Sequence, residues 1–173
     1  MPAKIVDVSY GSVDRRRGKK VGASKMLIHK DYDDAKTKND IALLEVKYPF
    51  TFGKEVKPIC LEMAPMPIVD KDAVIAGWGS YYVGGDGFDI LRQTTVTIYP
   101  DEICAMMYSK NSYSAGLQCC GRKRGKGMCK GDSGGPLMIR NGVGRFQQIG
   151  ISSYVEDVCA GEYPDVHTRV SGY

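Results

Sequence analysis

The sequence predicts an all-β domain with Greek-key or barrel character. Short apolar runs recur along all 173 residues, and 21 glycines and 8 prolines are scattered between them. This punctuation is typical of many short strands joined by turns rather than of long helices. A chain of this length is about one domain and can bury a substantial core.

The expected elements follow from local patterns along the chain. Residues 91–99 alternate β-branched and polar side chains, as expected of a strand with one buried face. The apolar run 73–79 ends in glycines around Trp78, which indicates a core strand. One short helix is expected over 101–108, because Pro100 and Asp101 suit a helix N-terminus. The other strands are expected at 5–10, 25–29, 39–46, 56–61, 137–140, 146–153 and 166–170, with an exposed, mobile glycine-rich loop at 82–89.

Composition excludes several classes of protein. The net charge of +4 is modest. No run approaches the roughly 18–20 apolar residues of a membrane span. Residues 1–7 lack the apolar core of a secretory signal. The six cysteines form no CxxC pair, which favours disulfides in an oxidising compartment over zinc. We therefore expect no metal, no cofactor, no nucleic-acid partner and no membrane insertion. Disulfides without a signal suggest that an upstream segment is missing.

The most informative stretch is a glycine-rich run that contains one serine. A serine hydroxyl is a good nucleophile when a base takes its proton and donors hold the oxyanion that forms. Flanking glycines would let a substrate carbonyl approach the N–H groups of Gly131 and Ser133. Taken alone, the run could also be an ordinary turn. It reads Cys129-Lys130-Gly131-Asp132-Ser133-Gly134-Gly135-Pro136-Leu137.

Three further segments occur with this run: Asn-Asp-Ile-Ala-Leu-Leu at 39–44, Pro-Ile-Cys-Leu at 58–61 and Ala-Gly-Trp-Gly at 76–79. Together they resemble the trypsin-like (chymotrypsin-fold, S1) serine proteases, from about residue 5 to the end. Alone, Asp40 would be a capping residue and Trp78 a core side chain. An unrelated β-barrel binding protein would require every match to be coincidence.

The resemblance implies a chymotrypsin-like double six-stranded Greek-key β-barrel within one partial peptidase domain, 1–173. About 1–70 would be the remainder of an incomplete first barrel and about 71–173 the second barrel. The C-terminal helix of the family would be missing.

The resemblance also implies catalytic roles. Ser133 would be the nucleophile, and Asp40 the buried carboxylate that orients a histidine and stabilises its imidazolium form. The N–H groups of Gly131 and Ser133 would form the oxyanion hole. Asp132 would be the acid that pairs with a freed N-terminal ammonium on activation.

By the same resemblance, five residues would bind substrate. Gly127 occupies the place of the aspartate at the base of a trypsin pocket. Asp165 takes the place of a pocket-wall glycine, so an acidic pocket would survive by relocation; the alternative is a solvated turn residue. Ser153 and Tyr154 belong to the strand that pairs with substrate backbone, and Val155 should obstruct large side chains.

The cysteine pairs implied by the resemblance are Cys104–Cys119 and Cys129–Cys159. Cys60 would bridge to an upstream segment or stay free, and Cys120 has no assigned role. The family and the cysteines together imply a secreted, extracellular protein.

The base that should activate Ser133 is absent from its expected motif. The sequence has two histidines. His29 lies on an expected strand 11 residues before Asp40, and His167 replaces a pocket-floor tyrosine. We therefore expect an incomplete serine endopeptidase chain that is inert as written. The alternative is a non-catalytic protease homologue that acts as a binding or regulatory module.

Two basic runs bear on partners. The run Arg15–Lys20 could meet an anionic partner or be a solvated loop, and the run 122–126 adjoins the pocket. A protein or peptide substrate is the partner that the resemblance implies.

Overall fold

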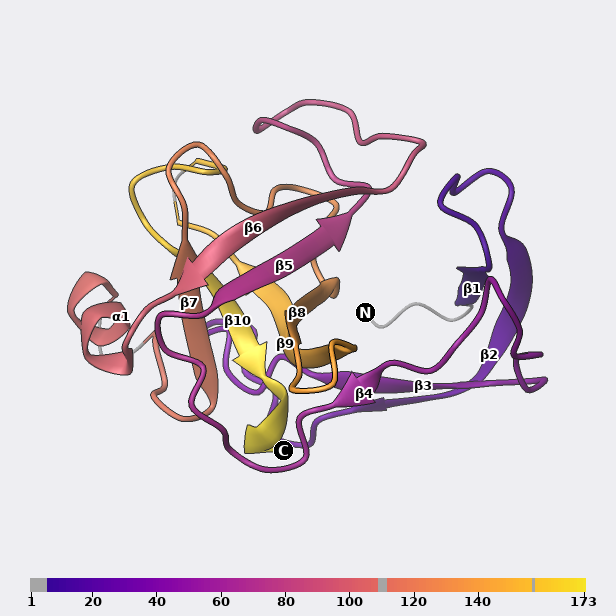
Figure 1. Cartoon of the computed structure of the whole chain (residues 1–173), viewed down its shortest axis with the longest axis horizontal. Coiled ribbons are helices and arrows are strands. Elements are labelled where there is room, and N and C mark those ends of the chain that lie inside the picture. Colours follow the sequence, from indigo (N-terminus) through magenta and orange to yellow (C-terminus); the bar gives the residue numbers. More distant parts are fainter. Residues whose placement is uncertain (1–5, 109–111, 157) are drawn as a thin grey trace.

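Two sheets organise the molecule, as Figure 1 shows for this computed structural model, which describes residues 6–108, 112–156 and 158–173. The first is a three-stranded antiparallel sheet of β1 (Asp7–Tyr10), β2 (Lys19–Ile28) and β3 (Ala42–Val46). The second contains β4 (Cys60–Leu61), β5 (Asp72–Gly77), β6 (Arg92–Ile98), β7 (Gln118–Arg122), β8 (Pro136–Arg140), β9 (Phe146–Tyr154) and β10 (Asp165–Arg169).

Six strands of the second sheet close into a barrel. Their pairing order is β10-β7-β6-β5-β8-β9, and β9 pairs again with β10. Because the six strands form a closed circuit, the barrel has no unpaired edge strand. Strand β4 adds to the outside of the circuit by parallel pairing with β9. This arrangement, with a second open sheet, confirms the predicted chymotrypsin-like all-β fold.

The core lies inside the barrel because strand alternation points one set of side chains inward. In β6, Val96 and Ile98 are buried, while Thr97 between them is only partly buried. Leu137 and Ile139 repeat the pattern in β8. By contrast, the three-stranded sheet leaves large apolar side chains exposed: Leu27, Ile28, Leu43 and Leu44.

Several expected elements shift at their ends. Helix α1 covers Asp101–Met107, one residue shorter than expected. The expected strand 56–61 is reduced to Cys60–Leu61. A short 3₁₀ turn, η1 (Val170–Gly172), follows β10.

The expected disulfide Cys104–Cys119 is wrong: Cys104 bonds Cys120. Successive strand residues face opposite sides, so Cys119 and Cys120 cannot both face α1. Cys120 shares a buried cluster with Cys104 and Tyr108 beside the helix. Cys119 points into the barrel core as a free thiol, and burial raises its pKa to about 12. The second disulfide joins Cys129 and Cys159, and Cys60 is free and exposed.

This pairing predicts that two neighbouring substitutions differ in their effect on the crosslink. Cys120→Ser removes the crosslink and should cost about 3 kcal/mol of stability, the value expected for a loop of this size. Cys119→Ser should leave the crosslink intact. Peptide mapping under non-reducing conditions, with urea unfolding, checks both. A Cys104–Cys119 peptide in the unmodified protein would contradict the assignment.

Candidate functional site

A tight turn places Ser133 next to β9. Gly134 donates its N–H to the Ser152 carbonyl at 2.8 Å, and the Ser152 N–H donates to the Gly135 carbonyl at 2.8 Å. Gly134 has a φ of 79°, a conformation that favours glycine. Ser133 itself is exposed. The turn therefore presents the serine hydroxyl to solvent beside β9.

The proposed oxyanion donors have free N–H groups. No hydrogen bond within the described ranges uses the backbone N–H of Gly131 or Ser133. Gly131 has a φ of 96°, and a Cβ there would lie 3.2 Å from the Gly79 Cα. Glycine at 131 thus permits the close packing that orients its N–H.

The acid before the serine is held inward by backbone donors. Asp132 accepts hydrogen bonds from the N–H of Gly79 at 2.8 Å and of Cys129 at 3.0 Å. A Cβ on Gly77 or Gly79 would lie 2.0–2.5 Å from this carboxylate. The glycines of the Gly-Trp-Gly segment therefore make room for Asp132. Sequence reasoning foresaw neither these donors nor this use of the glycines.

Asp40 reaches from the three-stranded sheet to the barrel. The Ser153 hydroxyl donates to Asp40 Oδ2 at 2.7 Å, and the Thr168 hydroxyl donates to the Asp40 carbonyl at 2.9 Å. Asp40 is therefore more than a local cap. Ser153, expected to meet substrate, orients this carboxylate, and Thr168 was not singled out in the sequence.

A cavity of about 770 Å³ lies between the two sheets. Asp40 and Ser133 both line it, together with Tyr32, Ile28 and Ser152. The structure therefore brings the two expected catalytic residues to one space, although 93 residues separate them in sequence.

Neither histidine lines that cavity. The His29 ring packs edge-on against Tyr173, and its Nδ1 accepts the Asp31 N–H at 3.2 Å. His167 is fully buried on β10, and its ring nitrogens have no hydrogen-bond partner among the described residues. Burial lowers the His167 pKa to about 4, so its imidazole is neutral at pH 7.

Asp165 is a buried carboxylate, 4% exposed, which excludes a solvated turn. The Met128 N–H donates to its Oδ2 at 2.7 Å. A Cβ on Gly127 would lie 2.8 Å from the same oxygen, so glycine at 127 makes room for the acid. Burial is the main reason that the Asp165 pKa rises to about 7.

The C-terminal end of β9 packs near this region, with Val155 directly after the strand. Val155 packs against the hydrophobic cluster of the barrel that contains Met128. The Tyr154 hydroxyl donates to the Ser112 carbonyl at 2.6 Å, and its ring packs edge-on against Tyr108 at 5.7 Å. These contacts fix the Tyr154 and Val155 side chains beside the candidate pocket.

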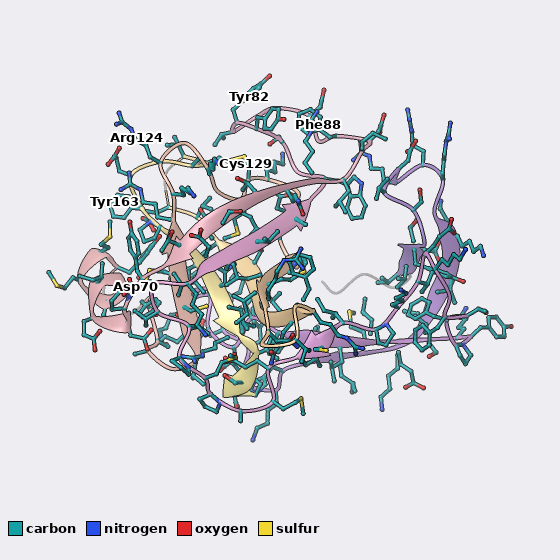
Figure 2. The ribbon with its side chains drawn as sticks, viewed as in Figure 1. Asp70, Tyr82, Phe88, Arg124, Cys129 and Tyr163 are labelled. Carbon is teal, nitrogen blue, oxygen red and sulfur yellow. A yellow bond between two sulfur atoms is a disulfide. The ribbon has the colours of Figure 1, made fainter. Side chains whose placement is uncertain are left out.

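The basic loop is partly neutralised within the chain. Arg16 pairs with Asp14 at 2.8 Å and with Asp89 at 2.9 Å, and Arg15 pairs with Asp89 at 3.1 Å. Hydrogen bonds from Arg16 lower the Asp14 pKa to about 2. Asp89 follows Phe88, which is labelled in Figure 2, in the glycine-rich loop after β5. In the described part of the chain, Lys19 has no ion pair.

The family of the chain follows from its match to a family model. A family model described as Trypsin matches residues 3–173. The chain belongs to the trypsin family. Its assignment to the S1 serine proteases, a group of hydrolases, follows from this match and from its serine protease relatives.

Three relatives indicate the range of similarity. Serine protease SP24D of Anopheles gambiae is 31% identical over 173 residues, which is 100% of this chain and 60% of that protein. Venom protease of Bombus pensylvanicus is 33% identical over 158 residues, covering 88% of this chain and 64% of the relative. Venom serine protease Bi-VSP of Bombus ignitus is 36% identical over 160 residues, covering 85% and 43%.

This trypsin-family chain spans less than two thirds of the length of the curated relatives it matches first, from 10% to 64%. Among the described residues, no helix has the length and apolar character needed to cross a membrane. Those residues also contain no cluster of three or more metal-ligating side chains.

The buried acid and the buried histidine predict opposing pH effects on stability. The Asp165 pKa rises from 3.8 to about 7 on folding. The contribution of Asp165 to the free energy of unfolding therefore falls as pH rises between those values. The His167 pKa falls from 6.5 to about 4, so its contribution increases as pH rises between about 4 and 6.5.

Asp165→Asn should therefore match the unmodified protein near pH 4 and exceed its stability at pH 8. The difference has an upper bound on the order of 4 kcal/mol, and Asn keeps an oxygen for the Met128 N–H. Urea unfolding at pH 4, 6 and 8 measures it. Glu162→Gln, at an exposed acid three residues away, is the control. Equal pH profiles for Asp165→Asn and the unmodified protein would contradict the buried-acid assignment.

Proposed function

We propose that the chain carries the nucleophile half of a serine endopeptidase site, in which Ser133 forms an acyl-enzyme. The observation that carries the proposal is the shared cavity of Asp40 and Ser133, with Asp40 oriented by Ser153. Membership of the trypsin family supports the same chemistry.

In the proposed reaction, the Ser133 Oγ attacks the scissile carbonyl while an imidazole takes its proton. The N–H groups of Gly131 and Ser133 bind the oxyanion, which is typically the largest single stabilisation in such a site. The imidazolium then gives its proton to the leaving amine, and Asp40 stabilises its charge. A water molecule then attacks the acyl-enzyme by the same steps and releases the carboxylic acid product.

The imidazole of this reaction would come from polypeptide outside the given sequence, because neither His29 nor His167 lines the cavity. We therefore propose that the 173-residue chain alone is nearly inert. Removal of the histidine from a serine triad costs roughly 10⁶ in turnover in subtilisin. The Asp132 carboxylate would pair with a cationic group when the site is activated.

The proposed substrate is a protein or peptide with a slim cationic side chain at the cleaved position. Asp165 is a buried acid with no cation bonded to it in the described chain, and such a charge favours a cationic ligand. A slim side chain is proposed because Val155, which packs against the cluster that contains Met128, would obstruct a large one. Gly127, at the place of a trypsin-type aspartate, makes room for Asp165 instead.

Three further assignments belong to the proposal. Secretion fits the two disulfides. An upstream segment would pair with the exposed Cys60 thiol. An anionic partner at Arg15–Lys20 would be held mainly by the lysines, because Arg15, Arg16 and Arg17 already pair with Asp14 or Asp89.

Chemical rescue tests the proposal. A fluorophosphonate probe should scarcely label Ser133 in the chain alone, and added imidazole should raise the labelling rate at least about tenfold. The reason is that a positioned base contributes roughly 10²–10⁴-fold and the cavity has room for an imidazole. Mass spectrometry of the labelled peptide measures the rate.

Matched variants make the test specific. Ser133→Ala should abolish labelling, and Asp40→Asn should remove the imidazole effect because an amide presents donors to the imidazole N–H. Asp72→Asn, at a carboxylate bonded to Thr97 on the barrel, should behave like the unmodified protein. Strong labelling without imidazole would refute the missing base. No rescue at any imidazole concentration would favour the non-catalytic homologue.

A further inference from the structure

Two carboxylates each accept a hydrogen bond from one of two consecutive backbone N–H groups in the loop before the nucleophile. The Met128 N–H donates to Asp165 at 2.7 Å, and the Cys129 N–H donates to Asp132 at 3.0 Å. Asp165 belongs to the candidate pocket, whereas Asp132 belongs to the turn that forms the oxyanion donors. One dipeptide thus connects the pocket acid to the catalytic turn.

The surrounding packing prevents the two acids from moving apart. Cys129 is crosslinked to Cys159, six residues before Asp165 at the start of β10. Asp132 fits against Gly77 and Gly79 with no space for a Cβ, and Asp165 fits against Gly127 in the same way. The Asp132 charge is accordingly one of the causes, after burial, that raise the Asp165 pKa.

No described cation compensates Asp165. On the neighbouring strand β7, Arg122 bonds Glu162 and the Gly161 carbonyl instead. His167, two residues along β10, is neutral because burial lowers its pKa to about 4. The other titratable groups on elements packed around Asp165 are of both signs. Tyr108, Tyr154, Tyr163 and Glu162 are acids. The loop that holds Gly127 and Met128 carries the exposed cations Lys123, Arg124, Lys126 and Lys130, none of which pairs with Asp165 in the described chain.

A small cavity lies on the Asp132 side of the loop. It holds about 90 Å³, enough for a few water molecules or an ammonium group. Asp132, Gly77, Gly79 and Ser80 line it, together with Gly127 and Met128, whereas Asp165 does not. A cation can therefore meet Asp132 there.

We propose that the charge on Asp132 controls the charge on Asp165, so that a cation bound at Asp132 makes the pocket acid ionise and the pocket select basic side chains. This rests on the proposed function, because Asp165 matters for selection only if the pocket binds substrate. The same event that orders the oxyanion donors would then also set the pocket's preference. With Asp132 uncompensated, the Asp165 pKa is raised to about 7, so this carboxyl is only about half ionised at pH 7.

Carboxyl-carbon NMR of the 173-residue chain, labelled at aspartate, tests the coupling directly. Asp165→Asn assigns the Asp165 signal. Asp132→Asn, which mimics neutralisation, should lower the Asp165 midpoint by about one pH unit. Glu102→Gln removes an exposed carboxylate of α1 that has no ion pair in the described chain, and it should leave the midpoint in place. A shift below about 0.2 units in Asp132→Asn, or an equal shift in Glu102→Gln, would overturn the proposal.

A measurement on the unmodified chain covers the case in which Asp132→Asn fails to fold. The Asp132 carboxyl carbon and the Cys129 N–H should both show a second inflection at the Asp165 midpoint. Their indifference at that pH would refute the coupling. Neither readout needs catalysis, so a failure of imidazole rescue would leave this result standing, and the reverse also holds.

Discussion

The Asp40 carboxylate is the contact on which the candidate site depends. It extends from the three-stranded sheet to the barrel, where the Ser153 hydroxyl binds it at 2.7 Å. The barrel is closed and holds Ser133 beside β9, but the smaller sheet exposes its apolar residues. The bonds from Ser153 and Thr168 hold this acid against the barrel. Two neighbouring bonds support the same segment, from Gln118 to the Thr37 carbonyl and from Tyr173 to Asn39.

Glycines determine the second feature of the site, the position of its acids. Gly77 and Gly79 make room for Asp132, and Gly127 makes room for Asp165. In each case the missing Cβ leaves space for a carboxylate that then binds backbone N–H groups. These acids are therefore held by main chain rather than by basic side chains, which leaves their charges open to control by a bound cation.

Much of the architecture could be predicted from the sequence, because alternation and glycine punctuation define strands such as β6 and β8 locally. Ser133 and Asp40 could be predicted as site residues because each lies in a short local motif. The disulfide partner of Cys104 could not be predicted by resemblance, since Cys119 and Cys120 differ only in which face of β7 they occupy. The ion pairs of Arg15 and Arg16 with Asp89 join loops 74 residues apart, and no local pattern shows such a contact. The burial of Asp165 likewise depends on three strands meeting.

The central claim is that Ser133 and Asp40 share a site that no imidazole of this chain enters. Side-chain nitrogen NMR of the two histidines, compared between the unmodified chain, Ser133→Ala and Asp40→Asn, tests it most directly. We expect the His29 and His167 ring signals to be the same in all three proteins. A ring signal that moves in both variants would place that histidine between the serine and the aspartate, and would contradict the account.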